Sequence, residues 1–117
     1  MKYVMFIVND PDHSDDDEAN APDVEDWFAF ARERGHYDLG VRLQDPPTAT
    51  TVRVRGGKTI TTDGPFAETK ESIAGFALIE AASLEEAIEL AVRNPSAHWG
   101  RIELREVHSF GGPIIGT

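Results

Sequence analysis

Residues Tyr3-Val4-Met5-Phe6-Ile7-Val8 form an apolar run in which both alternating faces of a strand would be hydrophobic. This pattern is typical of a strand in the middle of a sheet, covered on both sides. A run of the same kind, Ile73-Ala74-Gly75-Phe76-Ala77-Leu78-Ile79, predicts a second buried strand. These two strands decide the fold, because the rest of the molecule must cover both of their faces.

Two amphipathic helices are predicted beside these strands. In the first, apolar residues recur at intervals of three and four: Val24, Trp27, Phe28 and Ala31. Pro22 suits the first turn of this helix, and Gly35 suits its end. The second helix begins at the capping-box sequence Ser83-Leu84-Glu85-Glu86 and ends at Asn94-Pro95.

Two shorter strands complete the pattern. Residues 38–43 predict a strand with Arg42 on one face and three apolar side chains on the other: Leu39, Val41 and Leu43. The sequence Asp45-Pro46-Pro47 then predicts an extended loop. Residues 101–107 alternate between apolar and charged side chains, which predicts a last antiparallel strand with one solvent-exposed face.

A β-hairpin is predicted in the middle of the chain. Residues 50–55 and 58–62 flank Gly56-Gly57, which can supply the positive φ angles of a tight turn. Val52 and Val54 face one way in the first strand, opposite Thr51, Arg53 and Arg55. We expect Ile60 of the second strand to point inward.

The order of elements is β-α-β, an inserted hairpin, and then β-α-β. It predicts an α+β fold, a ferredoxin-like split βαβ plait with two helices on one face of an antiparallel sheet. The other apolar face then needs a cover. We predict a sheet-to-sheet homodimer, a dimeric α/β barrel, sealed in part by the apolar residues 110–115. Residues 1–117 are expected to form one domain, with an acidic loop at 10–21 and a C-terminal tail at 108–117.

The composition argues against several classes of function. The 117 residues include no cysteine, which excludes disulfides, thiolate zinc sites and a cysteine nucleophile and fits a reducing compartment. The formal net charge is −10, so nucleic-acid binding is not expected. No apolar run reaches membrane-spanning length and the chain starts directly on a strand pattern, so we expect a cytoplasmic protein without membrane contact.

Much of the negative charge lies in one segment: Asp10, Asp12, Asp15, Asp16, Asp17 and Glu18. Closely spaced carboxylates suit a calcium loop, but this run lacks the central glycine and terminal glutamate of the helix-loop-helix pattern. The composition favours a solvated, mobile loop. Because the four histidines also lack the spacing of a zinc enzyme, we expect neither a metal nor a cofactor.

The segment Thr62-Asp63-Gly64-Pro65-Phe66-Ala67-Glu68-Thr69-Lys70-Glu71 looks specialised. Pro65 fixes its own φ and Gly64 can adopt positive φ, so a rigid bend is predicted that orients Asp63. The alternative interpretation is that Asp63 caps the turn through its own backbone and Phe66 fills the core.

Two side chains are candidates for catalysis. Histidine titrates near neutral pH, so His98 beside Asp63 would form a general acid/base pair. In the alternative, His98 is an exposed or structural histidine of a surface turn. The candidate ligand-binding residues are Arg42, Phe66, Glu68, Lys70 and Glu71. Lys70 could instead pair with the flanking glutamates, and the alternation of Arg42, Arg53 and Arg55 also suits the solvent faces of strands.

The chain resembles the YCII-related superfamily, specifically its DGPF branch of small bacterial proteins. The likeness rests on these segments: residues 2–8, 47–55, 62–71, 75–79, 84–87, 94–95 and 102–107. The resemblance implies a dimeric ferredoxin-like α+β barrel with a cleft beside the sheet. Members of this branch are often encoded near extracytoplasmic-function sigma factors, which implies a regulatory setting.

Some YCII relatives carry a His-Asp pair, with the histidine on the first helix and the aspartate in an Asp-Pro after the second. This chain has no histidine in residues 24–34, and Asn94 precedes Pro95. Because an asparagine side chain does not exchange a proton near neutral pH, the pair cannot be transferred to this chain.

Two functional hypotheses follow. The first is a dimer with a polar cleft near the DGPF signature that binds a small anionic or carbonyl metabolite, with acid/base chemistry of an isomerase or lyase type. The alternative is a noncatalytic regulatory module that contacts a protein partner such as a sigma factor. A heme or quinone monooxygenase shares this fold, but no residue pattern specifies a heme ligand.

Overall fold

The computed structural model describes residues 1–10, 14–63 and 72–108 of the chain. Its elements are β1 (Lys2–Asn9), α1 (Asp15–Ala19), α2 (Val24–Glu33), β2 (Tyr37–Arg42), the 3₁₀ turn η1 (Pro46–Thr48), β3 (Thr50–Arg55), β4 (Lys58–Asp63), β5 (Ser72–Glu80), α3 (Leu84–Arg93), α4 (Ser96–Trp99) and β6 (Gly100–Glu106). The fold is therefore mixed α+β, as the sequence predicts. In the part of the chain described, no helix is long and apolar enough to cross a bilayer.

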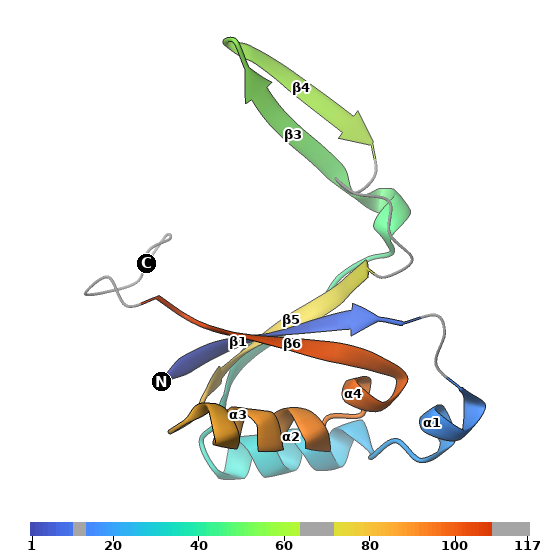
Figure 1. Ribbon diagram of the computed structural model, residues 1–117, viewed down its shortest axis with the longest axis vertical. Helices are drawn as coiled ribbons and strands as arrows, with labels where there is room; N and C mark the ends of the chain where they lie inside the picture. Colours follow the sequence, from blue (N-terminus) through green and yellow to red (C-terminus); the bar gives the residue numbers. More distant parts are fainter. Residues whose placement is uncertain (11–13, 64–71, 109–117) are drawn as a thin grey trace.

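Four strands form an antiparallel sheet in the order β2-β5-β1-β6 (Figure 1). β1 lies inside this sheet, where Met5 is paired with Ala77 of β5 and with Leu104 of β6. The central position of the two apolar strands is thus confirmed. Helices α2 and α3 lie side by side on one face of the sheet.

The hydrophobic core fills the space between this face and the two helices. Met5, Ile79 and Leu90 are fully buried there. Trp27 of α2 packs in the same core and donates a hydrogen bond from Nε1 to the Leu90 carbonyl oxygen at 2.9 Å. This bond ties α2 to α3 while satisfying the one polar atom of the indole.

Among the described residues, no helix lies over the opposite face of the sheet, here called the open face. Alternate residues of the central strands are only partly buried on this face: Val4 and Phe6 of β1, Phe76 and Leu78 of β5. On β2, Leu39 and Val41 pair with Leu78 and Phe76 and are 47% and 46% exposed. Within the described residues, helices therefore cover the two central strands on one face only.

Local hydrogen bonds set the helix ends and correct two details of the sequence analysis. Asp23, not Pro22, begins α2, because its side chain accepts hydrogen bonds from the backbone N–H groups of residues 25 and 26. At α3, the Ser83 hydroxyl accepts from Glu86 N as the capping box predicts. The Glu86 carboxylate, however, accepts from Ala82 N at 2.9 Å.

The acidic segment expected as a loop is helical in part. α1 begins at Ser14, whose hydroxyl accepts a hydrogen bond from Asp17 N while the Asp17 carboxylate accepts from Ser14 N. This reciprocal cap and the acidic first turn stabilise a short helix despite the density of negative charge. Among the described residues, no group of three or more histidine, aspartate or glutamate side chains is placed to hold a metal ion.

The hairpin forms a separate two-stranded sheet that projects beyond the four-stranded one (Figure 1). Its turn is made by Gly56 and Gly57, with φ angles of 57° and 76°. Ile60 pairs with Arg53, so it lies on the face opposite Val52 and Val54, and the expectation that it points inward is wrong. The predicted extended loop after Asp45 is also wrong in part, because residues 46–48 form a 3₁₀ turn.

Candidate functional site

A cavity of about 480 Å³ lies between α2, α4 and one end of the sheet. Its aromatic lining comprises Trp27, Phe28, Tyr37, Phe76 and Trp99. Its polar lining comprises Asn9, Arg42, Gln44, Asp45, Asn94 and Ser96. The volume is in the range of sites for small organic molecules, roughly 300 to 1,000 Å³.

Three of the aromatic rings form a rigid wall. The ring centroid of Tyr37 lies 6.1 Å from that of Trp27 and 5.4 Å from that of Phe28, both in edge-to-face geometry. The Arg32 guanidinium lies 4.8 Å from the Phe28 ring centroid on the same helix. These contacts fix the rings in the geometry that aromatic pairs prefer, so the wall is preorganised.

Two glycines allow the strands to approach closely beside this wall. A Cβ at Gly40 would lie 2.7 Å from the Tyr37 hydroxyl oxygen, and one at Gly75 would lie 2.4 Å from the Val41 carbonyl oxygen. Their hydrogen side chains therefore leave room for the tyrosine and for the β2–β5 pairing. Arg42 pairs with Gly75 and lies on the helix-covered side of the sheet, at the cavity.

Arg42 is the one cation and Asp45 the one carboxylate among the described lining residues. Within residues 1–10, 14–63 and 72–108, the Arg42 guanidinium forms no hydrogen bond or ion pair. It is exposed at the rim of the cavity. A guanidinium in this position can bind a carboxylate or a phosphate in a bidentate geometry.

Asn94 and Ser96 form the polar wall near α4. They are 4% and 7% exposed, and Ser96 N donates to Asn94 Oδ1 at 2.9 Å. This bond fixes the asparagine side chain through its oxygen. The Asn94 Nδ2 group forms no hydrogen bond with any other described residue, so it remains available as a donor.

Comparison with known protein families shows to which family the chain belongs. The family model of the YCII-related domain matches residues 1–111. The chain belongs to the YCII-related family. It is similar to an uncharacterized protein of Rhizobium meliloti (strain 1021), with 36% identity over 112 residues that cover 90% of each sequence.

Asn94 and the first long helix, α2, both contribute to the wall of the cavity. Asn94, which stands before Pro95, lines it at the end of α3. The first helix presents Val24, Trp27 and Phe28 to the same cavity, without a histidine. Among the described lining residues, this YCII-related chain therefore has an amide and aromatic rings around the cavity and no histidine.

The predicted catalytic residues are not brought together in the chain. Asp63 ends β4, opposite Thr50, and is exposed. His98 lies in α4, where its Nε2 atom is 2.9 Å from the Val92 carbonyl oxygen. Neither lines the cavity, and the two make no hydrogen bond or ion pair with each other. Within one chain, Asp63 and His98 therefore lie apart, because the hairpin extends beyond the four-stranded sheet (Figure 1).

The predicted ligand-binding residues have different outcomes. Arg42 lies at the cavity, on the face opposite Leu39 and Val41, as the alternation of the strand predicts. Four others lie outside the described residues: Phe66, Glu68, Lys70 and Glu71. Sequence reasoning missed Asp45 and Tyr37. Tyr37 begins β2 and Asp45 follows the strand, on either side of Arg42 in the sequence, and this proximity is the signal that could have indicated them.

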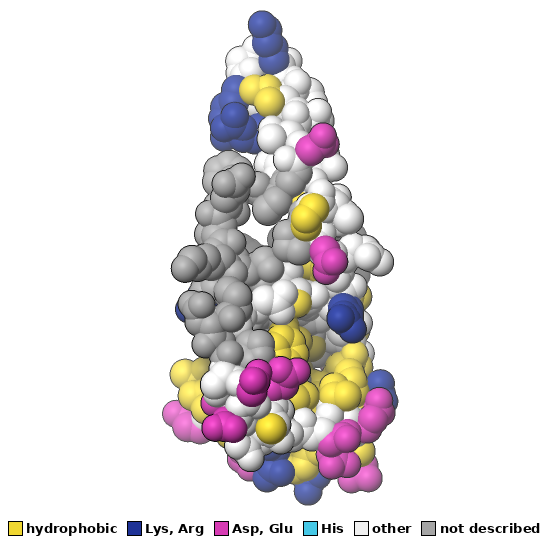
Figure 2. Space-filling view, turned by 90° about the vertical axis from the view of Figure 1, so that its right-hand side faces the viewer, with side chains coloured by type: hydrophobic (Ala, Val, Ile, Leu, Met, Phe, Trp, Pro, Cys, Tyr) yellow, Lys and Arg dark blue, Asp and Glu magenta, His cyan; other side chains and the backbone are white. Residues whose placement is uncertain are grey.

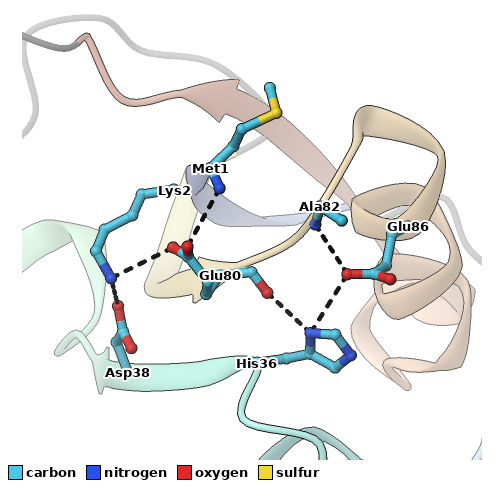
Figure 3. A network of polar contacts seen from close by, with 7 residues as sticks. All are labelled: Met1, Lys2, His36, Asp38, Glu80, Ala82 and Glu86. Carbon is cyan, nitrogen blue, oxygen red and sulfur yellow. Dashed lines mark hydrogen bonds and ion pairs between the residues drawn. The ribbon is translucent and has the colours of Figure 1, made fainter.

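A second polar cluster lies at the opposite end of the sheet (Figure 3). Lys2 Nζ pairs with the carboxylates of Asp38 and, at 3.4 Å, of Glu80, whose Oε1 atom also accepts from the Met1 ammonium at 3.2 Å. The hydrogen bond to Asp38 raises the pKa of Lys2, and the hydrogen bond from the Met1 ammonium lowers the pKa of Glu80. His36 Nδ1 lies 2.8 Å from the Glu80 carbonyl oxygen. These contacts join β1, β2 and β5 and do not reach the cavity.

Proposed function

We propose that this YCII-related protein is a homodimer that binds a small organic anion in the cavity between α2 and the sheet. The observation that carries the proposal is the Arg42 guanidinium, which has no partner among the described residues, beside a rigid aromatic wall. The wall suits the apolar body of a ligand, and the guanidinium suits its carboxylate. Asn94 and Ser96 add polar groups that can orient a carbonyl or hydroxyl of the ligand.

Proton transfer of an isomerase or lyase type is a further element of this proposal. The Asp45 carboxylate is the one carboxylate among the described lining residues, and a carboxylate can act as a general base. We therefore assign any such chemistry to Asp45, with Arg42 holding the anion next to it. Binding of the anion and its chemical conversion are separable, because they depend on different side chains.

The open face supports the homodimer. Leu39 and Val41 are about half exposed there, next to the partly buried Phe76 and Leu78. A second copy packed sheet to sheet would cover this surface. The strand order β2-β5-β1-β6 with two helices on one face fits a ferredoxin-like plait, and two such plaits would form the α/β barrel. Size-exclusion chromatography with light scattering should give the mass of two chains, and a monomer at high concentration would contradict the proposal.

Substitution of Arg42 tests the binding site. We expect short-chain carboxylates of four to eight carbons to raise the melting temperature of the wild-type protein. Arg42→Gln should weaken binding of the best carboxylate by about tenfold or more, because a charge-assisted hydrogen bond contributes roughly 1.5–3 kcal/mol. Isothermal titration calorimetry on both proteins measures this difference.

Arg34→Gln is the matched control, because Arg34 is exposed, lies outside the cavity and stacks on the Phe30 ring. It removes the same charge and should leave carboxylate binding within twofold of wild type. Asp45→Asn should retain binding and lose any turnover. Equal affinity of Arg42→Gln and wild type for every carboxylate would reject the site.

A further inference from the structure

The projecting hairpin, here called the arm (residues 50–63), has no cover among the described residues. Its strands are not hydrogen-bonded to the four-stranded sheet, and it extends beyond that sheet (Figure 1). Apart from the half-buried Thr51, every residue of the arm is exposed. A two-stranded ribbon of this kind is marginally stable by itself in water. A stable arm therefore needs a surface to pack against.

The two faces of the arm differ in chemistry. The pairs Val52–Thr61 and Val54–Thr59 place four uncharged β-branched side chains on one face. The other face carries the basic residues and one isoleucine: Arg53, Arg55, Lys58 and Ile60. Val52 and Val54 are 60% and 57% exposed. The face with Val52 and Val54, here called the valine face, is suited to burial against another protein surface, because it carries no charge to desolvate.

The point at which the arm leaves the sheet indicates what that surface is. The arm follows β2 and precedes β5, and these two strands carry most of the open face. A second copy seated on the open face would therefore lie beside the root of the arm. A six-residue strand spans about 20 Å at roughly 3.3 Å per residue, long enough to reach across a neighbouring sheet.

The distribution of charge also favours a second copy of the chain as the surface that covers the arm. The chain has a net charge of −10, yet three of its 11 basic residues lie on the arm: Arg53, Arg55 and Lys58. Figure 2 shows basic side chains at the tip of the arm and most of the visible acidic side chains over the helical end of the molecule. Two copies repel each other through their net charge, and the arm brings positive charge to the negative partner.

We propose that the arm is a clasp that packs its valine face on the second copy of the chain. The inference rests on the proposed homodimer and adds a contact to it. In a two-fold symmetric dimer each copy clasps the other, so both arms are covered at once. The basic face then lies toward the rim of the interface, where it lowers the repulsion between the copies.

The double variant Val52→Thr/Val54→Thr tests the clasp. It keeps β-branched side chains, and so the strand conformation, while making the face polar. We expect it to weaken the dimer more than tenfold in sedimentation equilibrium, since each dimer buries four of these valines. Ile60→Thr is the matched control: it makes the same kind of change on the other face and should leave dimerisation within twofold of wild type.

Leu39→Glu separates the clasp from the dimer itself, because it places a charge on the open face. If Leu39→Glu abolishes the dimer while the valine variant dimerises as tightly as wild type, the clasp is rejected and the sheet-to-sheet dimer stands. A wild-type monomer would reject both. Amide hydrogen exchange gives a second readout: arm amides should exchange more slowly above the dissociation constant than below it, and equal rates would overturn the clasp.

Discussion

The two faces of the four-stranded sheet are made by alternate residues of the same strands, yet they are buried to different extents. On the helix-covered face, Met5 and Ile79 are completely buried. On the open face, their neighbours Val4 and Leu78 are only partly buried. Both faces are apolar, yet the helices of the described residues cover only the first of them. The first face contributes to the stability of the monomer, and the second is the surface on which we propose association.

Substitution of two adjacent residues of β5 gives the largest expected effect. Ile79→Ala should lower the free energy of unfolding of the monomer by about 2–5 kcal/mol, because it leaves a cavity in a packed core. Leu78→Ala should lower the free energy of unfolding of the monomer by about 1 kcal/mol in dilute solution, and it should also weaken the dimer. Urea denaturation at several protein concentrations measures both effects. Equal costs for the two variants that do not depend on protein concentration would contradict a difference in role between the faces.

Gly75 lies where the β2–β5 pairing meets the cavity, and it gives the next largest effect. Gly75→Ala would bring Cβ to 2.4 Å from the Val41 carbonyl oxygen, so the strands must separate. We expect a loss of about 1–3 kcal/mol in the free energy of unfolding, the usual cost of overpacking. Arg42, the partner of Gly75 in the register, should move with β2, so carboxylate binding should weaken too.

Gly57→Ala is the control for this substitution. Gly57 has a φ of 76°, which is unfavourable for alanine. A Cβ added there would meet no other atoms within 4 Å, apart from those of its chain neighbours, so the backbone would be strained without a steric clash. We expect Gly57→Ala to lower the free energy of unfolding by about 1–2 kcal/mol, similar to Gly75→Ala, but to leave carboxylate binding unchanged. Thermal unfolding and calorimetry distinguish the two variants. Normal binding by Gly75→Ala would show that the close approach of β2 and β5 does not position Arg42.

Local patterns were sufficient for most of the secondary structure. The periodicity around Val24 and Leu84 identified the long helices, and the apolar runs identified β1 and β5, because these signals depend on neighbouring residues only. The position of Ile60 was wrong for a different reason. A two-glycine turn pairs Arg55 with Lys58, which places Ile60 opposite Arg53, so register depends on the turn and not on the alternation of one strand.

The candidate site required contacts that no local pattern contains. Alternation placed Arg42 opposite Leu39 and Val41 in β2, but the cavity also needs Trp27 from α2 and Asn94 from the end of α3. These residues are far apart in the sequence and meet through the packing of the sheet. The candidate pair Asp63 and His98 could not be judged from the sequence for the same reason, and within one chain the hairpin and α4 lie in different parts of the fold.

The polar cluster at the far end of the sheet should give the smallest effect, and it depends on pH. Hydrogen bonding to the Met1 ammonium lowers the pKa of Glu80 in the folded protein, so the ionised form is favoured by folding. Its contribution to stability is complete above the ordinary carboxyl pKa of about 4.3 and is lost as the pH falls through the lower, folded value. Glu80→Gln should therefore destabilise the protein slightly at pH 7, and its difference from wild type should disappear in acid.

Glu33→Gln is the control for Glu80, because Glu33 carries the same charge and is exposed near the end of α2. Urea denaturation of the three proteins between pH 3 and pH 7 should show a pH-dependent deficit for Glu80→Gln alone. The deficit should also shrink in high salt, since the ion pairs of Glu80 are about half exposed and exposed pairs are screened. A deficit that persisted unchanged at pH 3 would mean that Glu80 stabilises the ends of β1 and β5 through packing of its side chain and not through its charge.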